Sequence, residues 1–475
     1  MIETPTYLQR LSEFAADLSF SSLPVAVTSC VKEHMLDTVG VCLAATRIDT
    51  SQMAIRLAAS WGGPEESGTF GTNARFPAAA AAFVNGTLAH SLDFDDTHLP
   101  SVLHPSASIV PAALAVGEAV GATGREVIAA MVAGYEICIR AAMAAYDQSL
   151  GNSIFYERGW HATSICGTLG ASVAAAKLYG LDANKIGNAL GIAVSMASGV
   201  IEANRAGGSV KRLHCGWAAH AGIVAAQAAR VGFSGPASAF EGRFGFYQAF
   251  CSGHFCGHEL TQELGKQWAI LRVFYKPYPA NHFTHAAIDA SLKLRNRVAI
   301  EDIDNIEVGV ASPTLRTIAE PAEEKVRPRS GYHAQFSGPF AVAAAFMGGG
   351  GLGVWLDDFT DEKAADPRYI QLASKVTYMP NSECDAIFPN QFPAVLRLKT
   401  RSREVFEEKV LANRGGPENP LTADELRIKF MANSTRLISE KRALELADNI
   451  LRIEDRPVRE LSASCNSLSI VEKGL

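Results

Sequence analysis

Residues 167–178 read GTLGASVAAAKL, a run made almost entirely of glycine, alanine and other small or apolar residues. Small side chains let helices approach one another closely, so such a run favours a buried helix in a compact bundle. Similar runs recur at residues 78–82 and 225–229. The first part of the chain is therefore predicted to form a large multi-helix domain.

Helix-start signals agree with this prediction. Leu23 and Pro24 precede apolar residues at Val27, Val31 and Met35, the spacing of one helix face. A further apolar helical stretch is expected from residue 124 to residue 140.

The pattern changes after Trp268. Residues 306–310 alternate apolar positions with polar or small ones, which is typical of a strand. Residues 395–399 and 405–410 flank the polar turn 400–403 and predict a β-hairpin. Between these strands, residues 336–347 are expected to form a buried helix.

Helix then returns, because Thr422 and Glu425 have the spacing of a capping box. Periodicity is weak after Arg456. The expected fold class is mainly α, with a large multi-helix domain and an inserted smaller α+β lid domain. The expected bounds are 1–267 plus 411–475 for the helical domain and 268–410 for the lid.

The composition and charge of the chain exclude several classes of function. The chain has 475 residues, of which 48% are hydrophobic and 19% charged, which indicates a globular protein of two or three domains. A net charge of -6 without a basic stripe argues against a nucleic-acid partner. No uninterrupted apolar run approaches the roughly 18 residues of a membrane span, and no secretory signal is visible. The nine cysteines are scattered and odd in number, so we expect free thiols and a cytoplasmic location.

The segment HSLDFDDTH at residues 90–98, followed by His104-Pro105, holds three carboxylates and three histidines. These residue types suit acid–base chemistry beside a helix N-terminus that receives an anion. The alternative is a charged, capped loop in which Asp95 and Asp96 are merely solvated.

Three further segments offer site residues. His161 follows Gly159-Trp160 just before a helix, where it suits either proton transfer or simple core packing. Lys211 and Arg212 follow paired glycines and either bind carboxylates or form an ordinary basic loop. Lys276 lies between tyrosines and prolines that stiffen its loop.

Taken together, these segments resemble the MmgE/PrpD family, which includes 2-methylcitrate dehydratases, cis-aconitate decarboxylases and iminodisuccinate epimerases. The resemblance rests on six phrases in the family's order: HSLDFDDTH with LHPSAS, RGWHATSICGTLGA, GSVKRLHCGWAAHAG, YKPYPANHFTH, HAQFSGPFAVA and ENPLTADELRIKF. It spans nearly the whole chain. It implies a helical main domain with a lid, a homodimer, and catalysis on a small di- or tricarboxylate without metal or organic cofactor.

The resemblance also implies site residues. The catalytic candidates are Asp93, His104, His161, Lys211 and Lys276. The substrate-binding candidates are Thr97, Arg212, Asn281 and His282. Asn281 stands where the decarboxylase branch suggests a histidine, and no lid tyrosine matches.

The leading hypothesis is therefore a lyase that removes water from a 2-methylcitrate-like acid. The alternatives are an epimerase or racemase of an iminodisuccinate-like dicarboxylate, a cis-aconitate decarboxylase, and a non-catalytic carboxylate-binding protein on the same fold.

Two other patterns suggest different chemistry and are set aside. Cys251, His254, Cys256 and His258 are soft ligands in a tight cluster, but their spacing fits no common zinc finger, so no metal is expected. The glycines at 348–351 follow an apolar helix and lack a Gly-Lys-Ser/Thr ending, which favours a helix-terminating turn over a phosphate loop.

Overall fold

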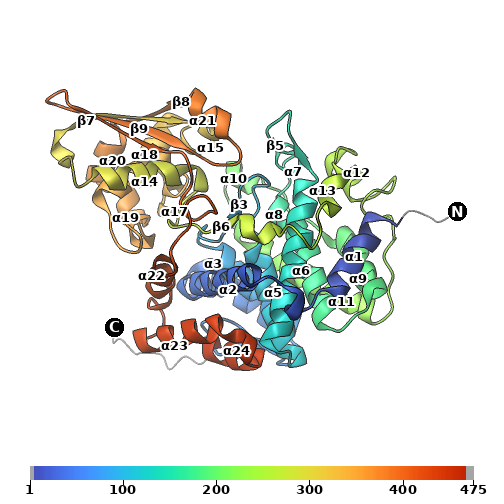
Figure 1. Ribbon diagram of the computed structural model, residues 1–475. Coiled ribbons are helices and arrows are strands. Elements are labelled where there is room, and N and C mark those ends of the chain that lie inside the picture. The colour runs from blue at the N-terminus through green and yellow to red at the C-terminus, as the bar shows by residue number, and fades with distance from the viewer. Residues whose placement is uncertain (1–4, 467–475) are drawn as a thin grey trace. The chain divides into compact units, whose positions relative to one another are not determined.

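The computed structural model describes residues 5–466, and these residues form two compact units (Figure 1). The helical unit comprises the chain up to Val273 together with the part from Asn433 onward, and the mixed unit comprises Phe274–Ala432. Helices dominate the first unit and a small sheet lies in the second, which confirms the predicted mainly α fold class. The domain bounds given above remain a prediction, because compactness alone does not define a domain.

The centre of the helical unit is a bundle of buried, alanine-rich helices. They are α4 (Ala78–His90), α5 (Ser106–Val120), α6 (Gly124–Met143), α8 (Ala162–Leu178), α9 (Ala183–Met196) and α11 (Val210–Arg230). Helix α8 contains the run GTLGASVAAAKL, and its residues from Ala162 to Ala176 are all buried. Small residues on every face allow this helix to pack against neighbours on all sides.

Helices α4 and α11 touch backbone to backbone. A Cβ atom added at Gly86 would lie 2.8 Å from the carbonyl oxygen of Cys215. One added at Gly216 would collide with the carbonyl of Phe83 and the hydroxyl of Thr87. Glycine is required at this crossing because any side chain would separate the two helices.

Further helices pack around the bundle. They are α1 (Tyr7–Asp17), α2 (Val25–Ala45), α3 (Asp49–Trp61), α7 (Ile154–Glu157), α10 (Ala203–Ala206), α12 (Phe246–Cys251), α13 (Gly257–Thr261), α23 (Glu440–Leu451) and α24 (Val458–Asn466). Two-residue strands occur at β1 (Ser67–Gly68), β2 (Arg75–Phe76), β3 (Thr97–His98), β4 (Tyr146–Asp147), β5 (Asn152–Ser153) and β6 (Val273–Phe274).

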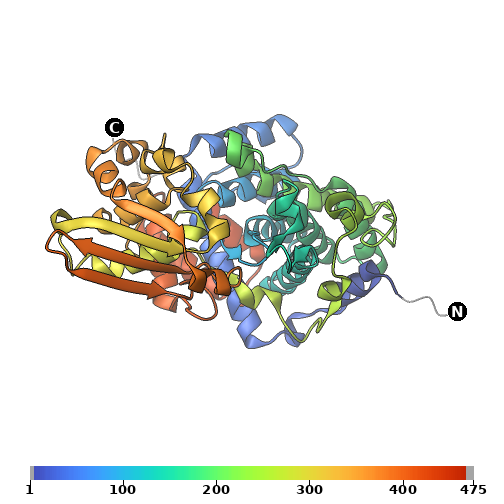
Figure 2. The same cartoon turned by 90° about the horizontal axis from the view of Figure 1, so that it is seen from above.

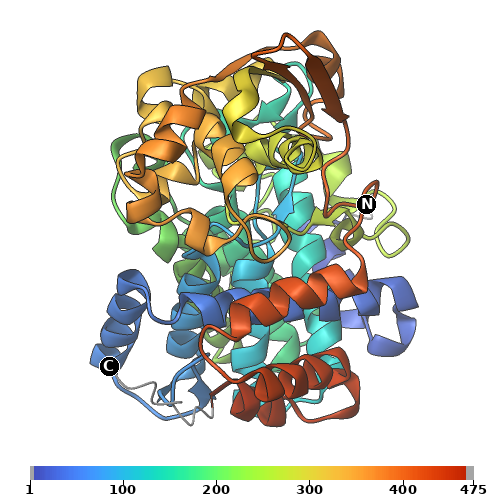
Figure 3. The ribbon, with the colours of Figure 1, turned by 90° about the vertical axis from the view of Figure 1, so that its left-hand side faces the viewer.

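The last helices complete the helical unit from the other end of the chain. Helix α23 packs against α2, and α24 against α5. Both are drawn in red at the bottom of Figure 3. Lys32 and Glu454 form an ion pair at 2.6 Å, and the Val458 amide donates to the carbonyl of Ala122 at 3.1 Å. The weak periodicity after Arg456 gave no helix from the sequence alone, whereas the structure forms α24 there.

The mixed unit is built on a four-stranded sheet in the order β10-β9-β7-β8. Its strands are β7 (Ile303–Val310), β8 (Val376–Pro380), β9 (Ala394–Thr400) and β10 (Val405–Val410). Strand β9 pairs antiparallel with β10 and β7, which confirms the predicted hairpin, and β8 runs parallel to β7.

Helices cover one face of this sheet (Figures 1 and 2). They are α14 (His285–Leu294), α18 (Gly338–Met347) and α20 (Pro367–Ala373), with shorter helices α15 (Leu315–Ile318), α16 (Ala322–Val326), α17 (Gly331–Ala334), α19 (Asp361–Ala364) and α21 (Ser382–Ile387) nearby. On β9, Leu396 and Leu398 are buried and Arg397 and Lys399 are exposed, which is the alternation of a half-buried strand.

Two predicted helices are confirmed, and a side-chain cap precedes each of them. Helix α18 begins after Ser337, whose hydroxyl accepts from the Phe340 amide at 3.0 Å. Helix α22 (Ala423–Ser434) begins with the expected capping box, because Thr422 accepts from the Glu425 amide at 3.2 Å and Glu425 accepts from the Thr422 amide at 2.8 Å.

Among the helices formed by residues 5–466, none combines the length and the apolar character needed to cross a membrane.

Candidate functional site

Four helix ends of the helical unit carry the candidate site. Helix α4 ends at His90, and the segment that follows it leads to the start of α5 at Ser106. His161 directly precedes α8, and Lys211 lies in the first turn of α11. The bundle thus holds side chains from distant parts of the sequence on a rigid frame.

The three carboxylates of the HSLDFDDTH segment are buried and bonded. The Oδ2 of Asp95 lies 2.6 Å from His90 Nδ1, and Asp96 accepts from the Ser106 amide at 3.2 Å. Lys211 Nζ donates to Asp93 at 2.8 Å. Asp95 and Asp96 are each 1% exposed, which excludes the alternative of a merely solvated loop.

Asp96 also pairs with His34 of α2, whose Nδ1 lies 2.9 Å from its carboxylate. Burial lowers the pKa of His34, but the Cys30 thiol and the Asp96 carboxylate outweigh it and raise the pKa to about 10. The raised pKa favours a protonated His34 beside the Asp96 carboxylate. The Ser106 hydroxyl donates to Asp96 and is itself hydrogen-bonded to the Tyr135 hydroxyl.

His104 has a defined tautomer. Its Nδ1 lies 2.6 Å from the backbone carbonyl oxygen of Asp96. Because a carbonyl oxygen can only accept, the proton must be on Nδ1, and the neutral ring carries its lone pair on Nε2. The Thr97 hydroxyl lies 3.3 Å from the same Nδ1, and the His104 amide donates to Thr163 at 3.1 Å. Hydrogen bonds thus hold both the ring and the backbone of His104. They fix the position of Nε2, which a group that transfers protons requires.

His161 belongs to a cluster of four imidazoles. The ring centres of His90 and His104 are 5.2 Å apart, those of His90 and His161 are 5.6 Å apart, and those of His161 and His214 are 5.0 Å apart. Burial, with further contributions from the neighbouring His90, His214, Lys211 and His104, holds the pKa of His161 well below its usual range. The ring is therefore neutral at physiological pH.

The Lys211–Asp93 pair is the charged element of the site. Asp93 has a φ of +52°, in the left-handed region that aspartate tolerates better than most residues. Lys211 is 8% exposed and Asp93 is 3% exposed, so their interaction is only weakly screened by solvent. Lys211 supplies a positive charge suited to a substrate carboxylate. Arg212, the next residue, is half-buried.

The remaining predicted residues lie in the mixed unit. Lys276 is 1% exposed, which is unusual for a lysine. Asn281 caps the short turn His282–Thr284 through its side chain, which accepts from the Phe283 amide at 3.0 Å. His282 is buried, with its ring centre 4.5 Å from that of His285.

The structure thus brings Asp93, Thr97, His104, His161 and Lys211 together within one unit. It adds four residues that were not individual site candidates: His34, His214, and His90 and Asp96, which sequence reasoning considered only as members of the HSLDFDDTH segment. His90 and His214 stand within the quoted phrases, and His214 follows Lys211 by three positions, so helical spacing was an available signal. For His34 no local signal exists, because its partner is far away in sequence.

One group of side chains has the composition of a metal site. Potential ligand atoms of His90, Asp95 and Cys215 lie within 4.8 Å of one another, and this is the one such group that residues 5–466 form. However, the 2.6 Å between His90 and Asp95 is a hydrogen-bond distance, shorter than the separation of about 3 Å between ligands 2.0–2.2 Å from one ion. Burial also raises the pKa of the Cys215 thiol, which keeps it protonated. These residues suit a hydrogen-bonded dyad better than a metal.

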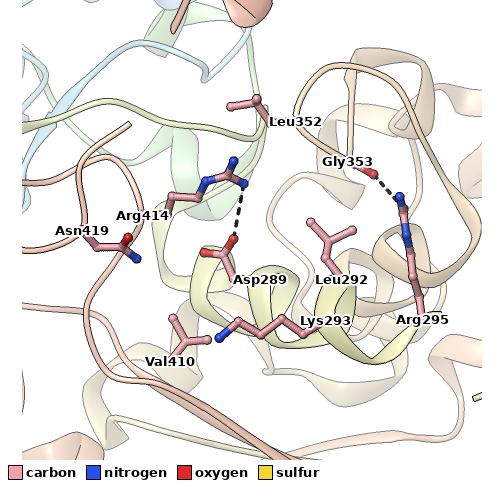
Figure 4. Close-up of a pocket in the computed structure, with 9 residues that line it drawn as sticks. All are labelled: Asp289, Leu292, Lys293, Arg295, Leu352, Gly353, Val410, Arg414 and Asn419. Carbon is pink, nitrogen blue, oxygen red and sulfur yellow. Dashed lines mark hydrogen bonds and ion pairs between the residues drawn. The ribbon is translucent and has the colours of Figure 1, made fainter. Parts of the chain in front are cut away.

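A cavity of about 440 Å³ lies within the mixed unit (Figure 4). Its polar lining residues are Asp289, Lys293, Arg295, Arg414 and Asn419, none of which the sequence predicted as a site residue. Figure 4 shows the guanidinium of Arg414 directed toward Asp289 and that of Arg295 toward the carbonyl of Gly353. These cations are already engaged with protein groups.

Comparison with known proteins gives two family matches and several relatives. The MmgE/PrpD N-terminal domain matches residues 9–257, and the MmgE/PrpD C-terminal domain matches residues 278–453. A cis-aconitate decarboxylase-like protein of Aspergillus oryzae is 27% identical, and the match covers 94% of each chain. The cis-aconitate decarboxylase of Aspergillus terreus is 24% identical, with 94% of this chain and 92% of that protein covered. The human cis-aconitate decarboxylase is 28% identical, with 93% and 89% covered.

Proposed function

The chain belongs to the MmgE/PrpD family, and on that premise we propose that it is a lyase acting next to the carboxylates of a small tricarboxylic acid. The observation that carries the proposal is the buried cluster in which two imidazoles, His104 and His161, lie with the Lys211–Asp93 pair. Such a site can bind an anion and move a proton beside it.

Each group has a role in this chemistry. His104 transfers the proton through Nε2, because its Nδ1 is committed to the Asp96 carbonyl. His161 stays neutral and donates a hydrogen bond to the negative charge that develops on the substrate, as neutral imidazoles of lowered pKa do elsewhere. Lys211 stabilises that charge electrostatically. From the resemblance, Lys276 is proposed as a further catalytic residue. Thr97, Arg212, Asn281 and His282 are proposed to bind the substrate carboxylates.

Decarboxylation of a cis-aconitate-like acid is the first candidate reaction. Two of the relatives named above are cis-aconitate decarboxylases and the third is a cis-aconitate decarboxylase-like protein, and all three match the chain over nearly its whole length. In this reaction a carbon–carboxylate bond breaks, its electron pair shifts the double bond, and a general acid protonates the distant carbon. One proton donor is sufficient.

Dehydration of a 2-methylcitrate-like acid is the second candidate. Asn281 favours it, because it occupies the loop position at which the resemblance to the decarboxylase branch implies a histidine. Dehydration needs a base for the proton alpha to the carboxylate and an acid for the departing hydroxyl. Racemisation of a dicarboxylate uses the same groups and returns the proton.

Several finer statements belong to the proposal. Catalysis is proposed to need no metal or organic cofactor, and the resemblance supports a homodimer. The nine cysteines are all free, which supports a reducing compartment such as the cytoplasm.

Proton NMR in deuterated buffer with EDTA tests the reaction against citrate-, aconitate- and iminodisuccinate-type acids. A vinylic product with release of carbon dioxide supports decarboxylation, and one that retains all carbons supports dehydration. Deuterium exchange with the skeleton intact supports the isomerase alternative. Carboxylate binding without any turnover would leave a binding protein and overturn the enzyme proposal.

His104→Asn tests the site itself. Asparagine keeps a donor for the Asp96 carbonyl but lacks Nε2, so kcat is expected to fall by about 10²- to 10⁴-fold. His220→Asn is the matched control, because His220 is a histidine of α11 whose Nδ1 lies 3.1 Å from the Ala79 carbonyl, outside the cluster. Equal activity in both variants would remove His104 from the mechanism.

A further inference from the structure

The ring of His214 faces that of His161 across the interface of α11 and α8. Their Nδ1 atoms are 2.9 Å apart, and the two residues are 6% and 4% exposed. His214 lies one helical turn after Lys211 on α11. His214 therefore lies in the site, although it has none of the roles proposed above.

A single proton lies between these two nitrogens. Burial, with further contributions from His90 and Lys211, lowers the pKa of His214 to about 4, and the pKa of His161 is also lowered. Both rings are therefore neutral at physiological pH, and one Nδ1 donates to the other.

The position of that proton decides what His161 offers elsewhere. If His161 Nδ1 donates, its Nε2 is a bare acceptor. If His214 Nδ1 donates, the proton of His161 is on Nε2, and His161 becomes a hydrogen-bond donor. Within the described residues, His161 Nε2 has no protein partner, so this atom is open to a ligand.

The surrounding charges favour the second arrangement once substrate binds. A carboxylate or developing enolate can only accept hydrogen bonds, and Lys211 beside the pair recruits such an anion. An Nε2–H on His161 would stabilise that anion, whereas a bare Nε2 would repel it.

We propose that His214 is a positioning residue that donates its Nδ1 proton to His161 and thereby keeps the His161 proton on Nε2, facing the anionic substrate. The inference rests on the proposed function, since it specifies how His161 meets the substrate there.

The backbone of His161 is fixed by other groups, which separates this role from packing. The His161 amide donates to the Gly199 carbonyl at 3.0 Å, and Gly199 itself has a φ of +139°. The His214 side chain forms its hydrogen bond with the His161 imidazole, so it acts on the protonation of that ring, whereas the Gly199 carbonyl holds the His161 backbone.

Two substitutions of nearly equal size test the inference. In His214→Asn the amide can still donate to His161 Nδ1. In His214→Asp the carboxylate can only accept, so the proton of His161 moves to Nδ1 and Nε2 becomes bare. We expect kcat of the aspartate variant to be about 10²-fold below that of the asparagine variant, with a smaller change in KM, the cost of losing one donor to the developing anion.

The pH profile adds a second readout. Protonation of the carboxylate introduced by His214→Asp restores a donor, so the aspartate variant should gain activity as pH falls, and the asparagine variant should not. The titratable groups that face His161 are His90 of α4, His104, and His214 and Lys211 of α11. His220→Asn on the same helix controls for general effects of histidine loss.

Side-chain ¹⁵N NMR of histidine-labelled protein reads the tautomer directly and needs no turnover. His161 should carry its proton on Nε2 in the wild type and the asparagine variant, and on Nδ1 in the aspartate variant. Equal kcat in His214→Asn and His214→Asp overturns the inference. The same His161 tautomer in both variants also overturns it. If no acid is turned over but the tautomer moves as expected, the proposed function fails and the coupling of the two histidines stands.

Discussion

The Nζ of Lys211 lies 2.8 Å from Asp93 in a setting that solvent hardly reaches. Breaking a buried pair by removing one partner leaves the other charge uncompensated, at a cost of about 3–5 kcal/mol. Asp93→Asn should therefore lower both activity and melting temperature. Asp93→Asn combined with Lys211→Met should recover most of the melting temperature but none of the activity. Thermal melting and kcat/KM check this, and a double variant as unstable as the single one would contradict it.

His34 makes the stability of the helical unit depend on pH. Its folded pKa of about 10 is above the ordinary value of 6.5, so the pair with Asp96 is fully stabilising below pH 6.5. That contribution is lost as pH rises toward 10, by roughly a few kcal/mol at about 1.4 kcal/mol per pKa unit.

The advantage in melting temperature of the wild type over His34→Gln should therefore shrink between pH 6.5 and pH 10. His220→Gln is the comparison, because burial lowers the pKa of His220, so the contribution of His220 to stability changes below pH 6.5 and stays constant between pH 6.5 and pH 10. A constant difference across this range would show that His34 is not charged in the folded protein.

The sequence predicted five residues that the structure gathers in the helical unit, because motifs carry residues that lie near one another along the chain. It could not predict His34, whose partner Asp96 lies on another element and whose charge depends on burial. Nor could it indicate that the Asp96 backbone, not a carboxylate, orients His104. These relations are contacts between elements, which a single sequence does not contain.

The crossing of α4 and α11 offers a test of how closely helices must pack for the site to form. In Gly216→Ala the new methyl collides with the Phe83 carbonyl, so α11 must move away from α4. Overpacking costs about 1–3 kcal/mol, and the shift also displaces Lys211 and His214 from His90.

We expect a lower melting temperature and a lower kcat for Gly216→Ala. Gly349→Ala is the control, because a Cβ there meets nothing within 4 Å. Unchanged activity in Gly216→Ala would mean that the helix crossing does not position the cluster.

Helix α14 carries a second pH-dependent group, Asp289. Its Oδ1 accepts from Tyr278 at 2.5 Å and lies 3.9 Å from Arg414, which also bonds Glu425. Burial raises the pKa of Asp289 from 3.8 to about 6. The folded state therefore binds more protons than the unfolded state between these pH values, and stability falls as pH rises through them.

Asp289→Asn removes the buried charge, so it should raise the melting temperature at pH 8 relative to the wild type and have little effect near pH 4. The exposed Asp304→Asn on β7 is the control. Differential scanning calorimetry at pH 8 and near pH 4 measures these melting temperatures. An equal change in melting temperature at the two pH values would show that the pKa of Asp289 is not raised.

The sequence predicted those helices and strands whose turn or capping residues lie close to them along the chain. It did not predict elements that depend on distant partners. The hairpin β9–β10 and the capped helix α22 depend on turn and capping residues within a few positions. Strand β8 reads VTYMP, ends in proline and becomes a strand through parallel pairing with β7, which lies far away in sequence. Helix α24 similarly depends on packing against the helical unit.

The mixed unit is continuous in sequence and has its own core, formed by residues such as Ile306, Phe340 and Leu396. A fragment of residues 274–432 should therefore fold alone and melt cooperatively. A fragment ending at residue 273 lacks α23 and α24 and should melt at a lower temperature than the helical unit in the whole chain. Circular dichroism of both fragments checks this, and a non-cooperative 274–432 fragment would contradict it.

The pairing of α23 with α2 and of α24 with Ala122 has a consequence for synthesis on the ribosome. Translation delivers every residue of the histidine cluster before the mixed unit, and delivers α23 and α24 after it. The nascent helical bundle thus remains incomplete, with apolar surface of α2 uncovered, while the mixed unit is made and can fold. The partly made chain is therefore the form most exposed to aggregation and most in need of chaperones.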